Sequence, residues 1–189
     1  KLSKKEGYRA RAAYKLKEID ETLGLLKPGQ VVVDLGASPG AWSQYVRRRL
    51  SPDGAAVGAL HGQIIALDLL PMDPIEGVHF IQGDFRENDV LDKLKEKLKG
   101  RQVGLVMSDM APNMSGVPLI DQARIMHLAE LSLEFALAHM KPDGAFLVKV
   151  FQGTDYEQFF RSMREAFKTV VVRKPDASRD RSAELYLLG

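Results

Sequence analysis

Four aspartates stand in equivalent positions along the chain, each at or just after the end of a short apolar run that predicts a buried β-strand. They are Asp34, Asp68, Asp84 and Asp109. If the strands are parallel, their carboxyl ends meet at one edge of the sheet, where carboxylates are costly unless they accept hydrogen bonds or face a cationic ligand. An aspartate after the second strand commonly binds the ribose of a nucleoside. The third is placed to accept a hydrogen bond from an adenine amino group. The series therefore favours a nucleoside-type cofactor, although one such aspartate is common in any α/β protein.

The residue best suited to proton transfer is Lys149, which lies inside the otherwise apolar run FLVKVF. A charged ammonium in such a strand pays a large desolvation penalty. The strand is expected to neighbour the one that ends at Asp109, so both side chains should lie at the same edge. A desolvated lysine near another cation loses its proton more readily and can act as a general base. The residue types alone also allow a lysine that reaches solvent or pairs with a carboxylate.

The stretch VVVDLGASPGAW, residues 31–42, predicts a strand, a tight turn and the start of a helix. Gly36 and Gly40 would let a ligand approach the backbone at a place where a Cβ would block it. The same glycines also suit an ordinary change of chain direction, so the turn alone leaves both interpretations open. A lone tryptophan such as Trp42 is typical of a buried anchor for the helix that follows.

Strands and helices are expected to alternate, which indicates an α/β fold with a mostly parallel sheet and helices on both faces. The predicted strands are 30–35, 63–68, 78–82, 103–108, 145–151, 169–173 and 183–188, and the predicted helices are 3–23, 41–50, 88–99, 119–140 and 156–167. The first helix rests on a capping box of Ser3 and Glu6. Residues 174–182 are too few for a parallel crossover, so the seventh strand should run antiparallel beside the sixth. We expect one domain over residues 1–189.

Composition excludes several classes of protein and indicates one kind of partner. The chain has no cysteine, so it has no disulfide, thiolate metal site or cysteine nucleophile. No apolar run approaches the roughly 20 residues that span a bilayer, and no signal-peptide pattern opens the chain, so we expect a soluble protein without a membrane partner. Residues 1–17 carry seven Lys or Arg, and residues 161–181 carry another seven. Together these ends could form a surface for a polyanion, although such runs are usually solvated helix faces.

Seven motifs, taken in order, cover nearly the whole chain: YRARAAYKL, DLGASPGAW, LDLLPMDP, QGDF, SDMAPNMSG, VKVFQG and RKPDASRDRSAELY. They resemble the FtsJ/RrmJ family of ribosomal RNA ribose 2′-O-methyltransferases. The resemblance implies the S-adenosylmethionine-dependent methyltransferase fold, a Rossmann-like sheet with a reversed seventh strand. Two features depart from the family pattern. Ala41 stands where the second glycine of a PGG turn is usual, and the loop at residues 51–62 is longer than the usual connection.

The resemblance also implies a Lys-Asp-Lys-Glu catalytic tetrad, with Lys149 as the general base for a ribose 2′-hydroxyl. The tetrad residues are Lys15, Asp109, Lys149 and Glu184. Family contacts to S-adenosylmethionine map onto Gly40, Trp42, Asp68, Asp84 and Asp109, and the turn itself adds Asp34 and Gly36. No metal is implied, because a sulfonium is already an activated methyl donor.

The expected substrate is ribosomal RNA, at a uridine of the large ribosomal subunit, with a monomeric enzyme in the cytoplasm, or in the mitochondrion if a leader has been removed. Candidate phosphate contacts in the basic ends are Arg9, Arg11, Arg173, Lys174, Arg179 and Arg181. Methylation of a transfer RNA or an mRNA cap, and a noncatalytic RNA-binding assembly factor, remain alternatives. A nicotinamide-dependent oxidoreductase is disfavoured, because the turn lacks GxGxxG spacing and the seventh strand is reversed.

Overall fold

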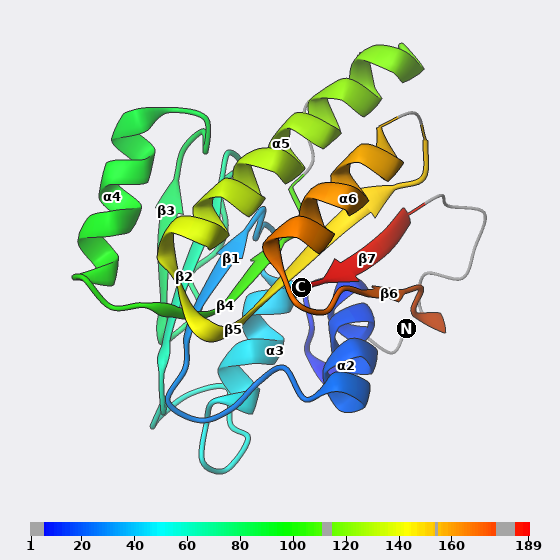
Figure 1. Ribbon diagram of the computed structural model, residues 1–189. Coiled ribbons are helices and arrows are strands. Elements are labelled where there is room, and N and C mark those ends of the chain that lie inside the picture. Colours follow the sequence, from blue (N-terminus) through cyan, green and yellow to red (C-terminus); the bar gives the residue numbers. More distant parts are fainter. Residues whose placement is uncertain (1–5, 111–114, 154, 177–183) are drawn as a thin grey trace.

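A computed structural model describes residues 6–110, 115–153, 155–176 and 184–189. Within these residues the chain forms a seven-stranded sheet in the order β3-β2-β1-β4-β5-β7-β6. Figure 1 shows α4, α5 and α6 on one face of the sheet and α2 and α3 on the other. The strands are β1 Val31–Leu35, β2 Gln63–Asp68, β3 Val78–Gln82, β4 Val103–Ser108, β5 Met140–Phe151, β6 Val171–Arg173 and β7 Glu184–Leu188. The helices are α2 Ala12–Leu23, α3 Ala41–Arg49, α4 Asn88–Leu98, α5 Pro118–His139 and α6 Tyr156–Ala166.

The direction of the strands confirms the predicted α/β class. Strands β1 to β5 pair in parallel, while β7 runs antiparallel to both β5 and β6. The reversed strand pairs with β6, as the short connection predicts, and its other neighbour is β5. Because strands β1 to β5 are parallel, their carboxyl ends lie together at one edge of the sheet, where the site is predicted.

The predicted helix over residues 3–23 is wrong in its first half. Residue 6 is helical, but residues 7–11 form turns and bends, and the regular helix α2 starts at Ala12. Gly7 has a left-handed φ of 81°, which breaks the helical path. The backbone N–H of Arg9 donates to Gln44 on α3 at 2.8 Å, so a long-range hydrogen bond uses that donor. Ser3 lies outside the described residues.

Two further expectations differ in detail. The sequence predicts a turn at residues 141–144, between the predicted helix 119–140 and strand 145–151, because they contain Pro142 and Gly144. In the structure they belong to the start of β5, where the pairing with β4 shifts register between Val103 and Leu105.

Helical periodicity over residues 119–140 predicts a buried side made of Ile125, Leu128, Leu131, Phe135 and Met140. Helix α5 buries Phe135 as predicted, but the other four are only partly buried, and Met126, Ala129 and Leu133 are buried in their place. Leu128 instead lines a cavity beside the sheet. Among the described helices, none is both long and apolar enough to cross a membrane.

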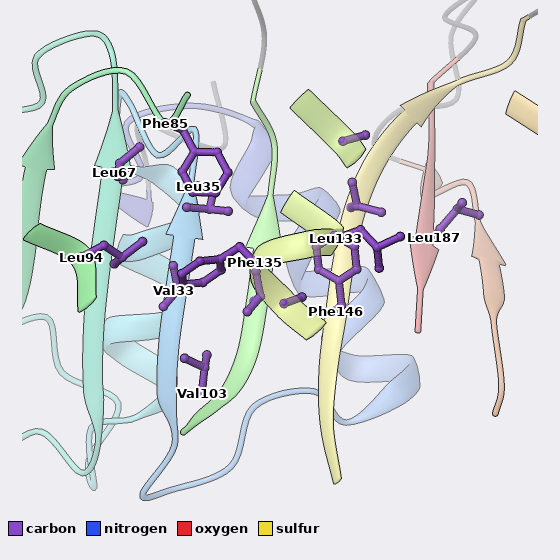
Figure 2. Close-up of a cluster of buried hydrophobic side chains, with 14 of the residues drawn as sticks. Val33, Leu35, Leu67, Phe85, Leu94, Val103, Leu133, Phe135, Phe146 and Leu187 are labelled. Carbon is purple, nitrogen blue, oxygen red and sulfur yellow. The ribbon is translucent and has the colours of Figure 1, made fainter. Parts of the chain in front are cut away.

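Two apolar clusters hold the layers together, one on each face of the sheet. Figure 2 shows the larger cluster, in which Val33 and Leu35 of β1 meet Phe135 of α5 and Leu94 of α4. The second cluster packs the opposite face of the sheet against α2 and α3. Each fully buried Val, Leu or Phe stabilises the fold by roughly 1.5–3 kcal/mol. Burial on both faces fixes the strand register, and therefore the positions of the residues at the strand ends.

Candidate active site

A cavity of about 520 Å³ opens at the carboxyl ends of β1, β2, β3 and β4, within the range of small-molecule sites. Of the predicted cofactor residues, Gly36, Asp68, Asp84 and Asp109 line it. The other lining residues are Leu67 of β2, Ser38 and 69–70 from the loops after β1 and β2, Gly83, 85–86, Met110, and Arg124, His127 and Leu128 from α5. The α5 residues were missed because a helix crossing over the strand ends leaves no local pattern. Phe85 had a usable signal, since it directly follows Asp84 in QGDF.

The turn after β1 is tight because it lies against the end of β4. Gly36 has a φ of 77°, and a Cβ on it would lie 2.7 Å from the backbone N and Cα of Met110. Any side chain there would both strain the backbone and push the two loops apart. The N–H groups of Gly36 and Ala37 donate to the carbonyl of Leu67 at 2.8 and 3.1 Å, which ties the turn to β2. The glycine therefore lets β1, β2 and β4 end close together around the cavity.

Asp68 and Asp84 already hold hydrogen bonds that shape the cavity wall. Asp68 accepts from the backbone N–H of Ser38 at 2.8 Å and of Leu70 at 2.9 Å, so it joins the loops after β1 and β2. Asp84 accepts three hydrogen bonds from the Arg86 side chain and one from its backbone N–H. The hydrogen bonds from Arg86 lower the pKa of Asp84 despite some desolvation. Both carboxylates line the cavity as acceptors for a ligand rich in donors.

Asp34 lies beneath the turn and does not line the cavity. It is fully buried, and Ser43 donates to its Oδ2 at 2.7 Å, while Oδ1 has no hydrogen-bond partner among the described residues. Burial raises the pKa of Asp34 to about 7, and repulsion from Asp109 and Asp68 adds to the rise, although the Ser43 hydrogen bond opposes it. Asp34 therefore keeps its proton to near neutral pH.

Trp42 and Gly40 also lie behind the cavity wall rather than along it. Trp42 is buried, its Nε1 donates to the carbonyl of Ala12 at 2.8 Å, and its ring lies against Tyr186 at 5.8 Å between centroids. It anchors α3 to α2 and β7. At Gly40, a Cβ would lie 2.9 Å from Ile75 Cδ1 and 3.0 Å from Arg9 Nη1. In the structure, Trp42 and Gly40 therefore make packing contacts within the protein and do not line the cavity.

The four predicted tetrad residues form two ion pairs at the same edge of the sheet. Lys149 Nζ lies 2.7 Å from Asp109 Oδ1, and Lys15 Nζ lies 2.5 Å from Glu184 Oε1. Lys149 is two residues after Leu147, which packs on the α2 and α3 face, so it projects to that face. In the antiparallel pair of β5 and β7, Glu184 lies opposite Phe151, which is two residues after Lys149. Asp109 belongs both to this group and to the cavity.

The electrostatics of this group balance two cations against two carboxylates. Desolvation raises the pKa of Asp109, and the nearby Lys149 opposes part of that rise. The four side chains are between 11% and 22% exposed, so they are shielded but still reachable from solvent. A shielded lysine beside a cavity is suited to exchanging a proton with a bound hydroxyl group.

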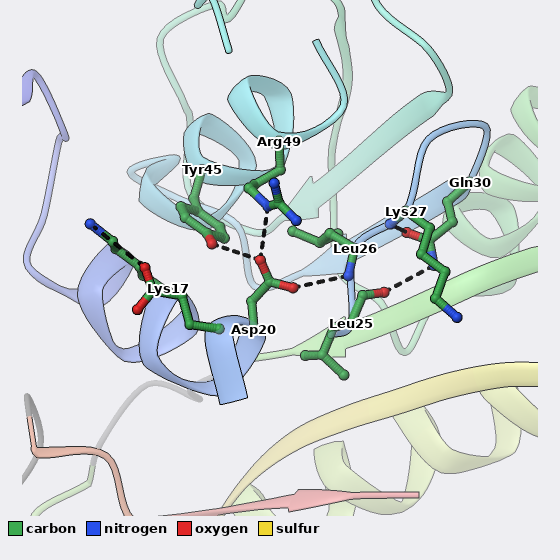
Figure 3. Close-up of polar contacts among 9 residues, drawn as sticks. Lys17, Asp20, Leu25, Leu26, Lys27, Gln30, Tyr45 and Arg49 are labelled. Carbon is green, nitrogen blue, oxygen red and sulfur yellow. Dashed lines mark hydrogen bonds and ion pairs between the residues drawn. The ribbon is translucent and has the colours of Figure 1, made fainter. Parts of the chain in front are cut away.

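Helix α2, which carries Lys15, is held in position by the buried carboxylate of Asp20, a residue that the sequence analysis did not identify. Figure 3 shows Asp20 at the centre of this contact. Its Oδ2 accepts hydrogen bonds from Tyr45 Oη at 2.7 Å and Arg49 Nε at 3.0 Å on α3. Its Oδ1 accepts from the backbone N–H of Leu26 at 3.0 Å, just after the helix. Asp20 therefore fixes the helix that carries Lys15.

Three of the predicted phosphate contacts hold hydrogen bonds within the protein, although none of those described is buried. Arg9 donates to backbone carbonyls of two loops, and Lys174 Nζ donates to the carbonyl of Glu184 at 2.7 Å. Arg11 is exposed, and Arg173 is partly exposed with a hydrogen bond from Nη1 to the carbonyl of Val172. Arg179 and Arg181 lie outside the described residues. Across the described ranges, no group of three or more His, Asp or Glu side chains is arranged to hold a metal ion.

The sheet order, the reversed β7 and the cavity at the strand ends define a Rossmann-like fold of the methyltransferase type. Residues 8–189 match the family described as FtsJ-like methyltransferase, and the chain belongs to that family. A protein from Dechloromonas aromatica is 69% identical over all of this chain and 88% of its own length, and one from Acidovorax sp. is 65% identical over all of this chain and 86% of its own. Both are named ribosomal RNA large subunit methyltransferase E.

A solved structure agrees with this assignment at the level of the fold. A crystal structure from Plasmodium falciparum, of a protein assigned to the ribosomal RNA methyltransferases, has a TM-score of 0.81 at 30% identity. The match covers 96% of each chain. The chain is therefore a methyltransferase of the FtsJ-like family with this fold along nearly its whole length.

Proposed function

We propose that the protein transfers a methyl group from S-adenosylmethionine to the 2′-hydroxyl of a ribose, at a uridine in large-subunit ribosomal RNA. The observation that carries the proposal is the double position of Asp109. Its side chain lines the 520 Å³ cavity and pairs with Lys149 at 2.7 Å. A methyl donor bound in the cavity and a base at Lys149 would therefore both lie next to Asp109.

The residues of the cavity fit this cofactor. Three carboxylates, Asp68, Asp84 and Asp109, line a space of suitable size, and they match a ligand with a positive charge and several hydroxyl and amino donors. Phe85 and Met110 supply apolar surface for a base. When bound, the cofactor supplies an electrophilic methyl group on a sulfonium. The acidic lining stabilises that positive charge at the reacting end of the site.

Lys149 is assigned as the general base. A lysine acts as a general base through its neutral amine. The neutral amine of Lys149 would take the proton of the ribose 2′-hydroxyl, and the ribose oxygen would accept the methyl group that the bound cofactor would supply, which would leave the cofactor as a thioether. Asp109 holds Nζ in place and stabilises the ammonium that forms. Lys15, fixed by Glu184, orients the hydroxyl. Positioning of the two reactants supplies much of the rate.

The substrate assignment rests on the relatives and on the exposed basic residues. Both bacterial relatives are named for large-subunit ribosomal RNA, and Arg11 and Arg173 offer charge for phosphate contacts beside the tetrad. We also propose that the protein has one domain, is a monomer and works in the cytoplasm. Transfer RNA, capped mRNA and a noncatalytic assembly role are the competing functions. Incubation with labelled cofactor and either large subunits, naked ribosomal RNA or transfer RNA separates them.

Replacement of Lys149 by alanine tests the mechanism. Loss of a general base costs roughly 10²–10⁴-fold in rate, so K149A should transfer methyl groups at least a hundredfold more slowly. Its affinity for S-adenosylhomocysteine, measured by calorimetry, should match that of the unaltered protein, because Lys149 does not line the cavity. Lys141→Ala is a matched control, since Lys141 lies on the same strand in an exposed pair with Asp143. Turnover by K149A near that of K141A would refute the assignment.

A further inference from the structure

Arg9 joins the two loops that border the cavity. Its Nη1 donates to the carbonyl of Pro39 at 3.0 Å and to that of Asp73 at 2.6 Å, and its Nη2 donates to the carbonyl of Pro74 at 2.9 Å. Pro39 belongs to the turn after β1, while Asp73 and Pro74 belong to the loop after β2. A side chain from the amino-terminal segment therefore bridges two loops that are 30 and more residues away in sequence.

Both loops form the cavity wall. Ser38 lines the cavity from the first loop, and Leu69 and Leu70 line it from the second. Ser38 Oγ also donates across the gap to the carbonyl of Pro71 at 2.9 Å. The bridge made by Arg9 continues this contact on the outer side of the wall, where its Nη1 lies against Gly40. If the bridge is lost, both loops lose a shared support.

The backbone of Arg9 is itself held in place. Its N–H donates to Gln44 Oε1 at 2.8 Å, and Gln44 Nε2 donates to the carbonyl of Gly7 at 3.1 Å. Gln44 lies in the first turns of α3, directly after the glycine turn. The planar guanidinium presents several donors in a fixed fork, so it can reach carbonyls from two loops at once. A lysine ammonium has the same charge but lacks that geometry.

We infer that Arg9 is a positioning residue for cofactor binding, which holds the turn after β1 and the loop after β2 at the separation that the cofactor requires. The inference rests on the function proposed above, because that proposal supplies the ligand. Because three of the five guanidinium N–H donors already bond carbonyls of the protein, we assign Arg9 to this bridge in place of the phosphate contact expected for it.

Arg9→Lys separates the bridge from the charge, and Lys141→Ala serves as the control, because Lys141 lies in an exposed pair with Asp143 away from the cavity. Calorimetry with S-adenosylhomocysteine should show roughly tenfold weaker binding by R9K, which corresponds to about 1.4 kcal/mol. Hydrogen exchange of the unliganded protein should be faster in R9K at residues 69–76. In turnover, R9K should raise the KM for S-adenosylmethionine while kcat at saturation is kept. K141A should match the unaltered protein in all three measurements.

A second control removes the effect of overall stability. Arg49→Ala breaks a contact of Asp20 on the far side of α3 and should keep full affinity for S-adenosylhomocysteine. Equal affinity in R9K and the unaltered protein would overturn the inference, and so would an equal loss in R49A. Failure of the unaltered protein to bind S-adenosylhomocysteine would instead contradict the proposed function.

Discussion

Replacing Asp34 by asparagine should remove a pH-dependent cost from folding. The carboxyl group is fully buried, and its pKa is about 7 in the folded protein against an ordinary value of 3.8. One pKa unit corresponds to 1.36 kcal/mol, so a shift of about three units corresponds to about 4 kcal/mol. The asparagine variant has no such group, and its oxygen can still accept the hydrogen bond from Ser43.

The sign follows from proton binding. Between pH 4 and 7 the unfolded chain has lost the proton of Asp34 while the folded protein keeps it, so the folded state binds more protons. The stability of the unaltered protein therefore falls as pH rises through this window. Between pH 5 and 8 the D34N variant should gain about 2.5 kcal/mol relative to the unaltered protein. The new amide group adds a cost that does not depend on pH, because no partner for it is found among the described residues.

Urea unfolding at fixed pH values from 5 to 8 measures this difference, because the midpoints report stability when the slopes agree. Taking the difference between two proteins cancels the titrating groups that do not interact with Asp34. Asp53→Asn is the control. The hydrogen bonds from Ser51 and Ala55 lower the pKa of Asp53, so it is ionised in both states above pH 5 and its difference should be flat. A flat difference for D34N, or one of opposite sign, would refute the reasoning.

Three further outcomes test other parts of the account. Gly36→Ala should lower the free energy of unfolding by at least about 2 kcal/mol in urea, because a Cβ would meet the backbone of Met110 and φ is positive; a smaller loss contradicts the tight turn. Asp20→Asn should cost about 1–2 kcal/mol and lower kcat more than it raises KM, because it loosens the helix of Lys15; unchanged kcat contradicts a positioning role. Arg11→Ala should weaken RNA binding and reduce the salt slope by about 1, and an unchanged slope excludes a phosphate contact.

The sequence predicts the strands better than their surroundings. The bounds of β2, β3 and β4 agree with the predicted ranges, because apolar runs bounded by Gly and Asp leave little choice of element. The antiparallel β7 follows from the length of one connection. The predicted strands also place Asp109 and Lys149 at the same edge of the sheet, because Asp109 directly follows one strand and Lys149 lies in the neighbouring one.

The roles of Arg9 and Asp20 could not be predicted from local patterns. Their partners lie far away in the chain, as in the bond from Arg9 to Pro74 across 65 positions. The failure of the first helix has the same cause, because Gln44 takes a backbone donor that a helix would use. Charge runs and helical periodicity contain no information on such partners, so a structural arginine and a phosphate-binding arginine look alike in the sequence.

The central claim concerns which atom receives the methyl group. Large ribosomal subunits that lack the modification would be incubated with S-adenosylmethionine and the protein, and the nucleosides of the RNA would then be identified by mass spectrometry. The account predicts one new 2′-O-methyluridine, absent when K149A replaces the unaltered protein. A methyl group on a base, or an equal yield of 2′-O-methyluridine with K149A, would contradict it.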